Sequence, residues 1–502
     1  LDIGTSGAKA IAVDPKGALH ASALAEYPLH TPKPGWAEQD PADWAAAARQ
    51  VLARLAAQIP AAEVRGIGLT GQMHGSVFLD AHDQVLRPAL LWCDQRTAPQ
   101  CDAITRQMGE RALLEMVGNP ALTGFTAPKI LWLRDHEPAA YEQVRRVLLP
   151  KDYVRLCLTG EHASDVSDAS GTLLFDVAHR TWHRDLMRQL GIDPDWMPPA
   201  FEGTETTGTL RADIAEAAGL PAGIPVVAGG GDQAAGGVGC GVVQPGVVSA
   251  SLGTSGVVFA YAERMETDPE GRIHTFCHAV PGAWHTMGVM LSAGGALRWF
   301  RDALCAEEVA EAARRHADPY ALITDLAGSA PAGAEGLLFL PYLAGERTPH
   351  KDPHARGAFI GFSLRHTKAH CARAVLEGVA YGMRDSVELM RGLGVAVDQV
   401  RVSGGGARSP LWRSILAACC RAPMVTLNVD EGPAYGAAIL AAVGAGAYAT
   451  VGEACADWVR PIEETVPHAP DADVYDAWHP AFVAAYRALA PGFARAAQQL
   501  DG

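Results

Sequence analysis

The string Gly-Thr-Ser-Gly occurs twice in this chain, at residues 4–7 and again at 253–256, about half of the chain apart. Each copy lies between two runs that are typical of β-strands. A repeat with this spacing and setting favours two domains of similar construction, related by duplication. Chance recurrence of four common small residues is the alternative. For a chain of 502 residues we therefore expect two domains, 1–240 and 241–502.

The charge balance argues against one broad class of function. The chain carries 41 basic and 56 acidic side chains, a formal net charge of −15, and no basic stripe offsets this balance. A nucleic-acid partner is therefore not expected. Hydrophobic residues make up 49% of the chain, which is ordinary for a globular protein with large cores. Any anion must be held by a local site rather than by the surface as a whole.

The cysteine pattern and one uncharged stretch bear on location. Ten cysteines are scattered without C-x-x-C spacing, which favours reduced thiols and a cytoplasmic protein. The stretch 432–452 has no charged residue and is long enough to cross a bilayer, but glycine and alanine dominate it. We expect a close-packed helix with flanking loops there, and no membrane partner. The sequence opens at Leu1 inside an expected strand, so we expect a few further residues before it.

Turn and helix signals divide the chain into alternating strands and helices, as in an α/β protein. Asp40 followed by Pro41 is an N-cap signal, and it predicts a helix as far as about residue 58. The other main expectations are strands at 1–3, 9–13, 64–70, 90–92, 224–228, within 246–262 and at 400–403, and helices at 294–303, 369–391, from 410 onward and along the C-terminal segment.

Both Gly-Thr-Ser-Gly turns are candidate phosphate-binding loops. Glycine lets the backbone approach a ligand closely, and successive N–H groups with two hydroxyls form an anion-binding concavity. The alternative for either copy is a plain hairpin turn.

Asp2 precedes the first turn and either holds Mg²⁺ beside the phosphates or is a solvated aspartate at a strand end. Gly404-Gly405-Gly406-Ala407 either admits an adenine ring or ribose, or is a tight turn.

Asp232 is the most informative single residue. It is the only charged residue between Ala217 and Ala262, and it follows an expected strand and three glycines. Burying a lone carboxylate is unfavourable unless it has partners or a task. Two interpretations stay open: an N-cap aspartate, worth ~1 kcal/mol, and a general base at the floor of a cleft.

Polar residues follow two further apolar runs. Gln72-Met73-His74-Gly75 comes after the expected strand at 64–70, where side chains are well placed to contact a ligand. Trp92 follows the next run, together with Asp94 and Arg96. A tryptophan face packs against the apolar face of a sugar, while imidazole and carboxylate groups bond its hydroxyls. The alternative for Trp92 is a core aromatic.

Taken together and in this order, the motifs resemble the FGGY family of carbohydrate kinases. The resemblance covers the chain from Asp2 to about Ala447. Each motif is weak alone, and it is their joint order that is specific. The strings that carry the resemblance are Trp36-Ala37-Glu38-Gln39-Asp40-Pro41, Gly71-Gln72-Met73-His74-Gly75, Gly124-Phe125-Thr126-Ala127-Pro128-Lys129, Leu149-Pro150-Lys151-Asp152-Tyr153, Ser164-Asp165 through Gly171-Thr172, Gly229-Gly230-Gly231-Asp232, Tyr342-Leu343-Ala344-Gly345-Glu346-Arg347-Thr348-Pro349-His350 and Ser403-Gly404-Gly405-Gly406-Ala407-Arg408-Ser409.

The resemblance implies two actin-like, ribonuclease H-like α/β domains with an active-site cleft between them, the first mainly sugar-binding and the second mainly ATP-binding. It implies transfer of the γ-phosphoryl group of ATP, with Mg²⁺, to the 5-hydroxyl of D-xylulose. Asp232 matches the family's catalytic base, and Asp2 matches the aspartate near Mg²⁺. The implied sugar contacts are Met73, His74, Trp92, Asp232 and Gln233, and the implied ATP contacts are Thr5, Ser6, Gly253, Thr254, Ser255, Gly295, Gly404, Gly405, Gly406 and Ala407.

Two residues depart from the family pattern beside the implied sugar site: Gln233 and Cys93 stand where the family often has asparagine. One alternative is therefore another FGGY activity, on a different ketose or on a polyol. From a different class, an actin-fold ATP-binding sensor without a sugar substrate is the other alternative. Asp232 and the Met73-His74 pair argue against a sensor, which needs no base beside a hydroxyl. The family is often dimeric, so a homodimer is the assembly that the resemblance suggests.

Overall fold

The computed structural model describes residues 1–429 and 431–500, and these fall into two compact units. Unit 1 comprises Leu1–Gln244, Tyr261–His285 and Glu431–Arg460. Unit 2 comprises the described parts of Pro245–Ala260, Thr286–Asp430 and Pro461–Gly502. Each unit is therefore assembled from separate stretches of the chain. The expected domain division at residue 240 follows the halves of the sequence, and it stays a prediction.

The central sheet of unit 1 has five strands in the order β15-β5-β1-β2-β3. β1 pairs antiparallel with β2 and parallel with β5, and β5 pairs parallel with β15. The carboxyl ends of β1, β5 and β15 therefore lie side by side at one edge of the sheet. The bounds are β1 Asp2–Ile3, β2 Gly7–Val13, β3 Leu19–Glu26, β5 Thr70–Gly71 and β15 Gly230–Gly231.

The strand expected at 64–70 is much shorter than predicted. Only β5, Thr70–Gly71, is regular, with one further bridge from Ile67 to Val226. Gly66 and Gly68 explain the difference, because glycine weakens a strand and allows another backbone to approach closely. A Cβ at Gly68 would overlap the Ala437 carbonyl oxygen of the helix α16 (Gly432–Gly444).

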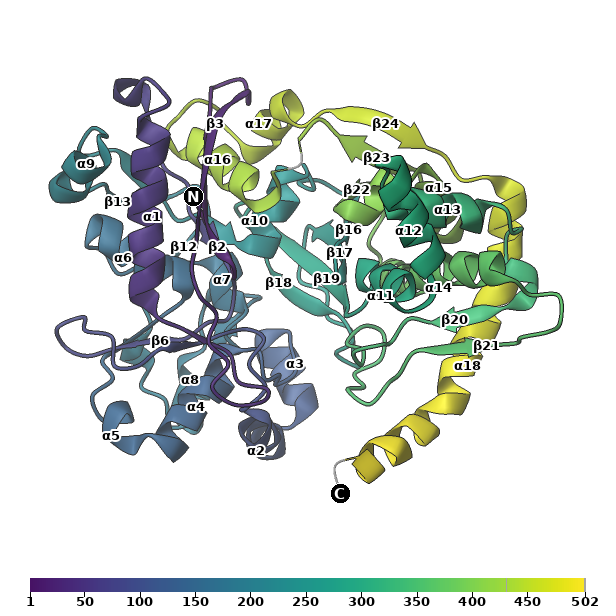
Figure 1. Cartoon of the computed structure of the whole chain (residues 1–502). Coiled ribbons are helices and arrows are strands. Elements are labelled where there is room, and N and C mark those ends of the chain that lie inside the picture. The colour runs from purple at the N-terminus through teal and green to yellow at the C-terminus, as the bar shows by residue number, and fades with distance from the viewer. Residues whose placement is uncertain (430, 501–502) are drawn as a thin grey trace. The chain divides into compact units, whose positions relative to one another are not determined.

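The other elements of unit 1 surround this sheet. Helix α1 (Pro41–Ala56) begins at the N-cap Asp40, as predicted, and packs on β2 and β3 (Figure 1). The remaining strands are β4 Glu38–Gln39, β6 Val77–Leu79, β7 Ala89–Leu90, β8 Arg146–Leu148, β9 Ser164–Asp165, β10 Phe175–Asp176, β11 Thr181–Trp182, β12 Ala200–Phe201, β13 Thr206–Thr209, β14 Pro225–Val227 and β18 His274–Cys277. The remaining α-helices are α2 Ala98–Met108, α3 Glu110–Val117, α4 Thr126–His136, α5 Pro138–Tyr141, α6 Pro150–Thr159, α7 Val166–Ser170, α8 Arg184–Gln189, α9 Ala212–Ala218, α10 Asp232–Gly239, α16 and α17 Val451–Trp458.

Helices α10 and α16 pack with their backbones in contact. A Cβ at Gly436 would overlap the Ala235 carbonyl oxygen, and one at Gly239 would overlap that of Gly432. This close approach explains the glycine- and alanine-rich stretch 432–452, and the predicted close-packed helix is confirmed. Across the part of the chain that the structure describes, no helix is long and apolar enough to cross a bilayer. The contact also fixes α10, whose first residue is Asp232.

The main sheet of unit 2 repeats the strand order of unit 1. The part of this seven-stranded sheet that lies mainly in unit 2 runs β19-β17-β16-β22-β23-β24, in which β16 pairs antiparallel with β17 and parallel with β22. The order β3-β2-β1-β5-β15 thus recurs as β19-β17-β16-β22-β23, with a Gly-Thr-Ser-Gly turn in each antiparallel pair. Such recurrence is what the predicted duplication requires. The bounds are β16 Gly246–Leu252, β17 Gly256–Ala262, β19 Trp284–Met290, β22 Val397–Ser403, β23 Met424–Leu427 and β24 Pro461–Thr465.

The helices of unit 2 agree with most of the expectations. Helices α13, α14 and α15 pack against one another beside the sheet (Figure 1). The C-terminal segment contains β24 as well as helices, and the sequence missed this strand because PIEET is exposed and lacks alternating apolar residues. The remaining elements are α11 Gly294–Leu304, α12 Ala306–Arg315, α13 Pro319–Gly328, β20 Leu338–Leu340, β21 Ala358–Ile360, α14 Lys368–Gly392, α15 Pro410–Cys420 and α18 Ala469–Leu500.

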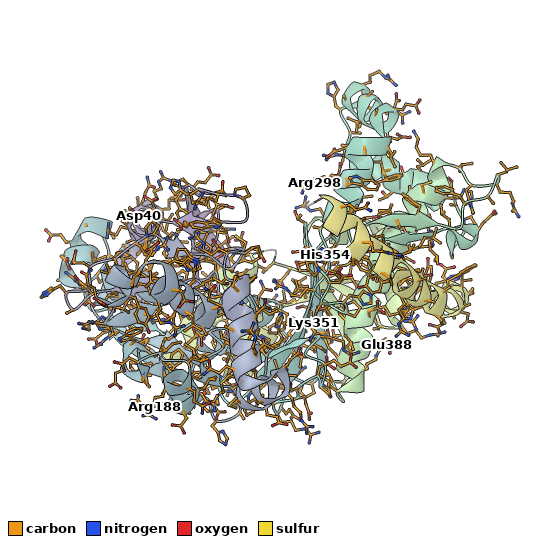
Figure 2. All side chains as sticks on the ribbon, turned by 90° about the horizontal axis from the view of Figure 1, so that it is seen from below. Asp40, Arg188, Arg298, Lys351, His354 and Glu388 are labelled. Carbon is orange, nitrogen blue, oxygen red and sulfur yellow. The ribbon has the colours of Figure 1, made fainter. Side chains whose placement is uncertain are left out.

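Charged side chains project from the surface of both units (Figure 2). Asp40, Arg188 and Glu388 are examples, and all three are exposed. These charges are therefore solvated. A small set of charged residues in unit 1 is fully buried instead, among them Lys129 and Lys151.

Replacing Gly436 by alanine tests the contact between α10 and α16. The added Cβ must push two backbones apart, so we expect Gly436→Ala to destabilise the protein by about 1–3 kcal/mol. Gly452→Ala in α17 is the matched control, because the nearest atom to a Cβ there is 3.9 Å away. Thermal unfolding of both variants measures the effect. Equal melting temperatures for the two variants would contradict the close contact.

Candidate functional site

Three strand ends of unit 1 bring the predicted residues of the first half together. β1 ends at Ile3 and leads into the Gly4-Thr5 turn, β5 leads into Gln72-Met73-His74, and β15 leads directly into Asp232. Ile3, Gly71 and Gly231 are neighbours across the parallel pairs. The residues that follow these strands therefore leave the sheet at the same level.

Asp232 is the first residue of α10, and the N-cap is Gly231. The N-cap interpretation of Asp232 is therefore wrong. Burial raises the pKa of the Asp232 carboxyl to about 7, and the negative charge of Asp2 adds to this effect, while hydrogen bonds with Gln233 oppose it. A carboxyl group that titrates near neutral pH is suited to accept a proton in a reaction.

Asp2 is a half-buried carboxylate on β1. Its Oδ1 is buried and has no hydrogen-bond partner within residues 1–429 and 431–500. Burial raises the pKa of Asp2 to about 6, although the nearby Lys9 ammonium opposes this. An unpartnered carboxylate oxygen close to a second carboxylate fits a hard cation such as Mg²⁺. The described residues contain no cluster of three ligating side chains, so Mg²⁺ here would keep waters and use phosphate oxygens.

The first Gly-Thr-Ser-Gly turn is held by side chains from distant parts of unit 1. The indole Nε1–H of Trp92 donates to Thr5 Oγ1 at 2.9 Å, and Gln39 Nε2 donates to the Thr5 carbonyl oxygen at 2.7 Å. The Thr5 hydroxyl lies 3.3 Å from Gln72 Oε1, and Ser6 is exposed. These bonds fix the turn before any ligand binds.

Trp92 is 41% exposed, so the core-aromatic alternative is wrong. Its indole donates to Thr5 of the candidate phosphate-binding turn, and part of the side chain stays exposed to solvent. This arrangement is compatible with stacking against a sugar, and the sugar contact stays a prediction.

Met73 and His74 lie beside the end of β15. Met73 is 3% exposed, and a Cβ at Gly231 would lie 2.7 Å from its Cγ. His74 has a left-handed backbone with φ of 67°, a conformation that costs about 1–3 kcal/mol in a residue other than glycine. Its Nδ1 lies 2.7 Å from the Gly171 carbonyl oxygen. Such strain is retained only where the surrounding structure holds it, as at a binding site.

Asp94 and Arg96 do not share the surroundings of Trp92. The Asp94 carboxylate is fully buried, accepts the Ala37 N–H at 2.7 Å and pairs with Arg96 at 2.7 Å. Arg96 also pairs with Glu38 and stacks on Trp36. The sequence grouped Asp94 with ligand contacts, and this is corrected: its acceptors are used by an internal ion pair.

A buried charge cluster is linked to Gly231, the residue before Asp232, and sequence reasoning missed its role. Lys151 Nζ lies 2.6 Å from Asp152, 2.6 Å from Asp165 and 3.2 Å from Asp168, and all of these side chains are inaccessible. Burial raises the pKa of Asp168 well above its usual range. The sequence signal for this cluster is Pro150-Lys151-Asp152 at the start of an apolar helix, because charges buried there need partners.

Ser167 links this cluster to the strand that carries Asp232. Its Oγ donates to Asp165 Oδ1 and accepts the Gly231 N–H at 3.1 Å. Gly231 immediately precedes Asp232. The orientation of the Asp232 carboxyl is therefore coupled to the buried cluster through one hydroxyl group.

The predicted residues of the second half gather in unit 2. β16 leads into Gly253-Thr254-Ser255 and β22 leads into Gly404, and these strands pair in parallel through Ser251 and Ser403. The Gly295 N–H donates to the Thr254 carbonyl oxygen at 3.0 Å, which places Gly295 against the same turn. Both loops therefore lie at one edge of the sheet.

The backbone of these loops suits a nucleotide. Gly404 has φ of 82°, a conformation that favours glycine, and a Cβ at Gly405 would meet nothing within 4 Å. Ala407 is buried and accepts a hydrogen bond from Arg413 at 2.8 Å. Open, side-chain-free backbone next to anchored residues can admit a flat ring or a ribose.

Comparison with known proteins identifies the class. The FGGY family of carbohydrate kinases matches in its N-terminal domain over residues 1–239 and in its C-terminal domain over residues 248–445. The chain therefore belongs to the FGGY family of carbohydrate kinases. The predicted α/β fold with two actin-like domains and the predicted kinase class are confirmed. Kinases of this family use ATP as the phosphoryl donor.

Individual relatives resemble the chain over nearly its whole length. It is 42% identical to the xylulose kinase of Escherichia coli K12 over 481 aligned residues, and this alignment covers 96% of each chain. It is 44% identical over 444 residues to the xylulose kinase of Klebsiella pneumoniae, covering 88% of this chain and 89% of the relative. The crystal structure of xylulose kinase from Rhodospirillum rubrum matches with a TM-score of 0.91 and 35% identity, over 98% and 99% of the two chains.

The link through Ser167 predicts an effect on catalysis. Ser167→Ala removes the acceptor of the Gly231 N–H, so we expect sugar-dependent ADP release to fall about 3- to 10-fold per folded molecule. Ser170→Ala is the control, because Ser170 is a buried hydroxyl of the same helix that bonds Val166 and Cys277 instead. If both variants lose the same activity at equal stability, the link to Asp232 is refuted.

Proposed function

We propose that this kinase transfers the γ-phosphoryl group of ATP to the 5-hydroxyl of D-xylulose, which yields D-xylulose 5-phosphate in the breakdown of pentose sugars. The observation that carries the proposal is the position of Asp232 beside Met73 and His74, at adjacent strand ends. The high identity to xylulose kinases over nearly the full chain supports the choice of sugar.

Asp232 acts as the general base in this proposal. Its carboxylate accepts the proton of the sugar hydroxyl and directs that oxygen at the γ-phosphorus. Phosphoryl transfer has a largely dissociative transition state, so the protein mainly positions groups and stabilises charge. Met73, His74, Trp92 and Gln233 hold the sugar, with the imidazole and amide groups bonding hydroxyls and the indole face covering an apolar face.

The phosphates and the nucleotide are assigned to the glycine-rich loops. In unit 1, Thr5 and Ser6 contribute N–H and hydroxyl donors to the phosphates. In unit 2, the assigned ATP contacts are Gly253, Thr254, Ser255, Gly295, Gly404, Gly405, Gly406 and Ala407. Backbone N–H groups bind phosphate oxygens without lysine side chains, which agrees with an acidic chain. Mg²⁺, held through Asp2 and water, would neutralise charge on the phosphates when bound.

The domain roles and the setting are further parts of the proposal. We assign sugar binding mainly to residues 1–240 and ATP binding mainly to residues 241–502. Ten cysteines without C-x-x-C spacing favour a reducing compartment such as the cytoplasm. The family resemblance favours a homodimer.

A panel of sugars tests the substrate. ADP release is measured with D-xylulose, with other ketoses and with polyols, and we expect the highest kcat/KM with D-xylulose. Because Gln233 and Cys93 depart from the family pattern, the main alternative substrate is a different ketose or a polyol. A higher kcat/KM with one of these would overturn the assignment. Sugar-independent ATP hydrolysis as the main activity would instead favour a sensor.

The raised pKa of Asp232 predicts the pH dependence of the reaction. The base must be ionised to accept a proton, so kcat/KM for the sugar should fall as pH decreases through about 7 and level off above it. Asp232→Asn should lower turnover by about 10²- to 10⁴-fold and remove this acid limb, while ATP binding is kept. Turnover near that of the wild type, with ATP binding intact, would refute the assignment of Asp232 as the base.

A further inference from the structure

Lys129 is a fully buried lysine whose hydrogen bonds go to main-chain carbonyl groups. It lies in α4, and its Nζ donates to the carbonyl oxygens of Gly124 at 2.6 Å and His74 at 2.8 Å. Its side chain is inaccessible, and within the described ranges no carboxylate lies within ion-pair distance of its Nζ, although the charge of Asp94 favours the ammonium form. A buried ammonium is costly without partners, so the two carbonyl groups add to the compensation that the negative charge of Asp94 provides.

The His74 carbonyl receives two bonds from the same helix. Besides Lys129, the Thr126 hydroxyl donates to it at 3.1 Å. His74 has the left-handed backbone described above, and its ring lies 4.8 Å from that of Phe125. Because the peptide plane is rigid, fixing this carbonyl fixes the backbone direction that follows His74.

The second bond of Lys129 reaches the neighbourhood of Trp92. Its acceptor is the carbonyl group of Gly124, and a Cβ at Gly124 would lie only 2.7 Å from the Trp92 carbonyl oxygen. One ammonium group therefore connects the two loops that carry His74 and Trp92. Neither connection requires Lys129 to touch a ligand.

We propose that Lys129 is a positioning residue for sugar binding: its ammonium group holds the His74 peptide so that the imidazole is presented to the sugar in one orientation. The inference rests on the proposed role of His74 as a sugar contact. It assigns a task to the Gly124-Phe125-Thr126-Ala127-Pro128-Lys129 string, which the catalytic steps do not use. A purely structural lysine would change stability alone, whereas this role predicts a selective change in the KM for the sugar.

Lys129→Met tests the role, because methionine keeps an apolar stem and removes the donors. We expect the KM for the best sugar of the panel to rise about tenfold or more, with the KM for ATP and kcat changed by less than about threefold. Thr126→Val removes the other bond to the same carbonyl, and Thr126→Ser keeps it. The valine variant should raise the KM for the sugar and the serine variant should not, so the test stands even if Lys129→Met fails to fold.

A double-mutant cycle separates this inference from the proposed function. His74→Ala alone should raise the KM for the sugar, and adding Lys129→Met should then change it little, because Lys129 acts through His74. An unchanged KM in His74→Ala would refute the sugar contact and the inference with it. A raised KM in His74→Ala, with an unchanged one in Lys129→Met and Thr126→Val, would overturn the role of Lys129 alone. Fully additive effects would also overturn it.

Discussion

Parallel pairing of β1, β5 and β15 is the constraint on which the candidate site of unit 1 depends. The register sets Asp2 beside Thr70 and Thr70 beside Gly230, so three loops leave the sheet at one level. A slip of one residue would turn each side chain to the opposite face. The contact of α10 with α16 then fixes the helix that begins at Asp232. The side chains at this edge are therefore positioned by backbone contacts between small residues.

The sequence predicted features that depend on local composition. The repeated turn, the lone charge of Asp232 and the cap at Asp40 are visible because neighbouring residues determine them. The pairing of Arg96 with Glu38 and the cluster around Lys151 escaped prediction, since residues distant in the sequence supply these partners through tertiary packing. The same holds for the units, which combine separate stretches of the chain. The strand β24 was missed because pairing with β23, rather than a hydrophobic pattern, defines it.

Two buried lysines support the site of unit 1 by different means. Lys151 is surrounded by carboxylates, while Lys129 is bound by carbonyl groups. Each is connected to a strand end by few hydrogen bonds, through Ser167 in one case and directly to His74 in the other. Bonds in a low-dielectric interior are strong and costly to break. The loops at the carboxyl ends of the strands are therefore held by buried hydrogen bonds despite their glycine content.

The crowding at Gly171 has a consequence for redesigning the enzyme. A Cβ at this position would overlap the His74 imidazole, so every other amino acid displaces the ring. Laboratory evolution toward new sugars should therefore leave residue 171 unchanged. Accepted substitutions should accumulate instead at side chains that do not hold His74 in place. Gln233 and Cys93 are the first positions to randomise. Under the proposed role of His74, the range of substrates is thus limited by a residue that has no side chain to contact them.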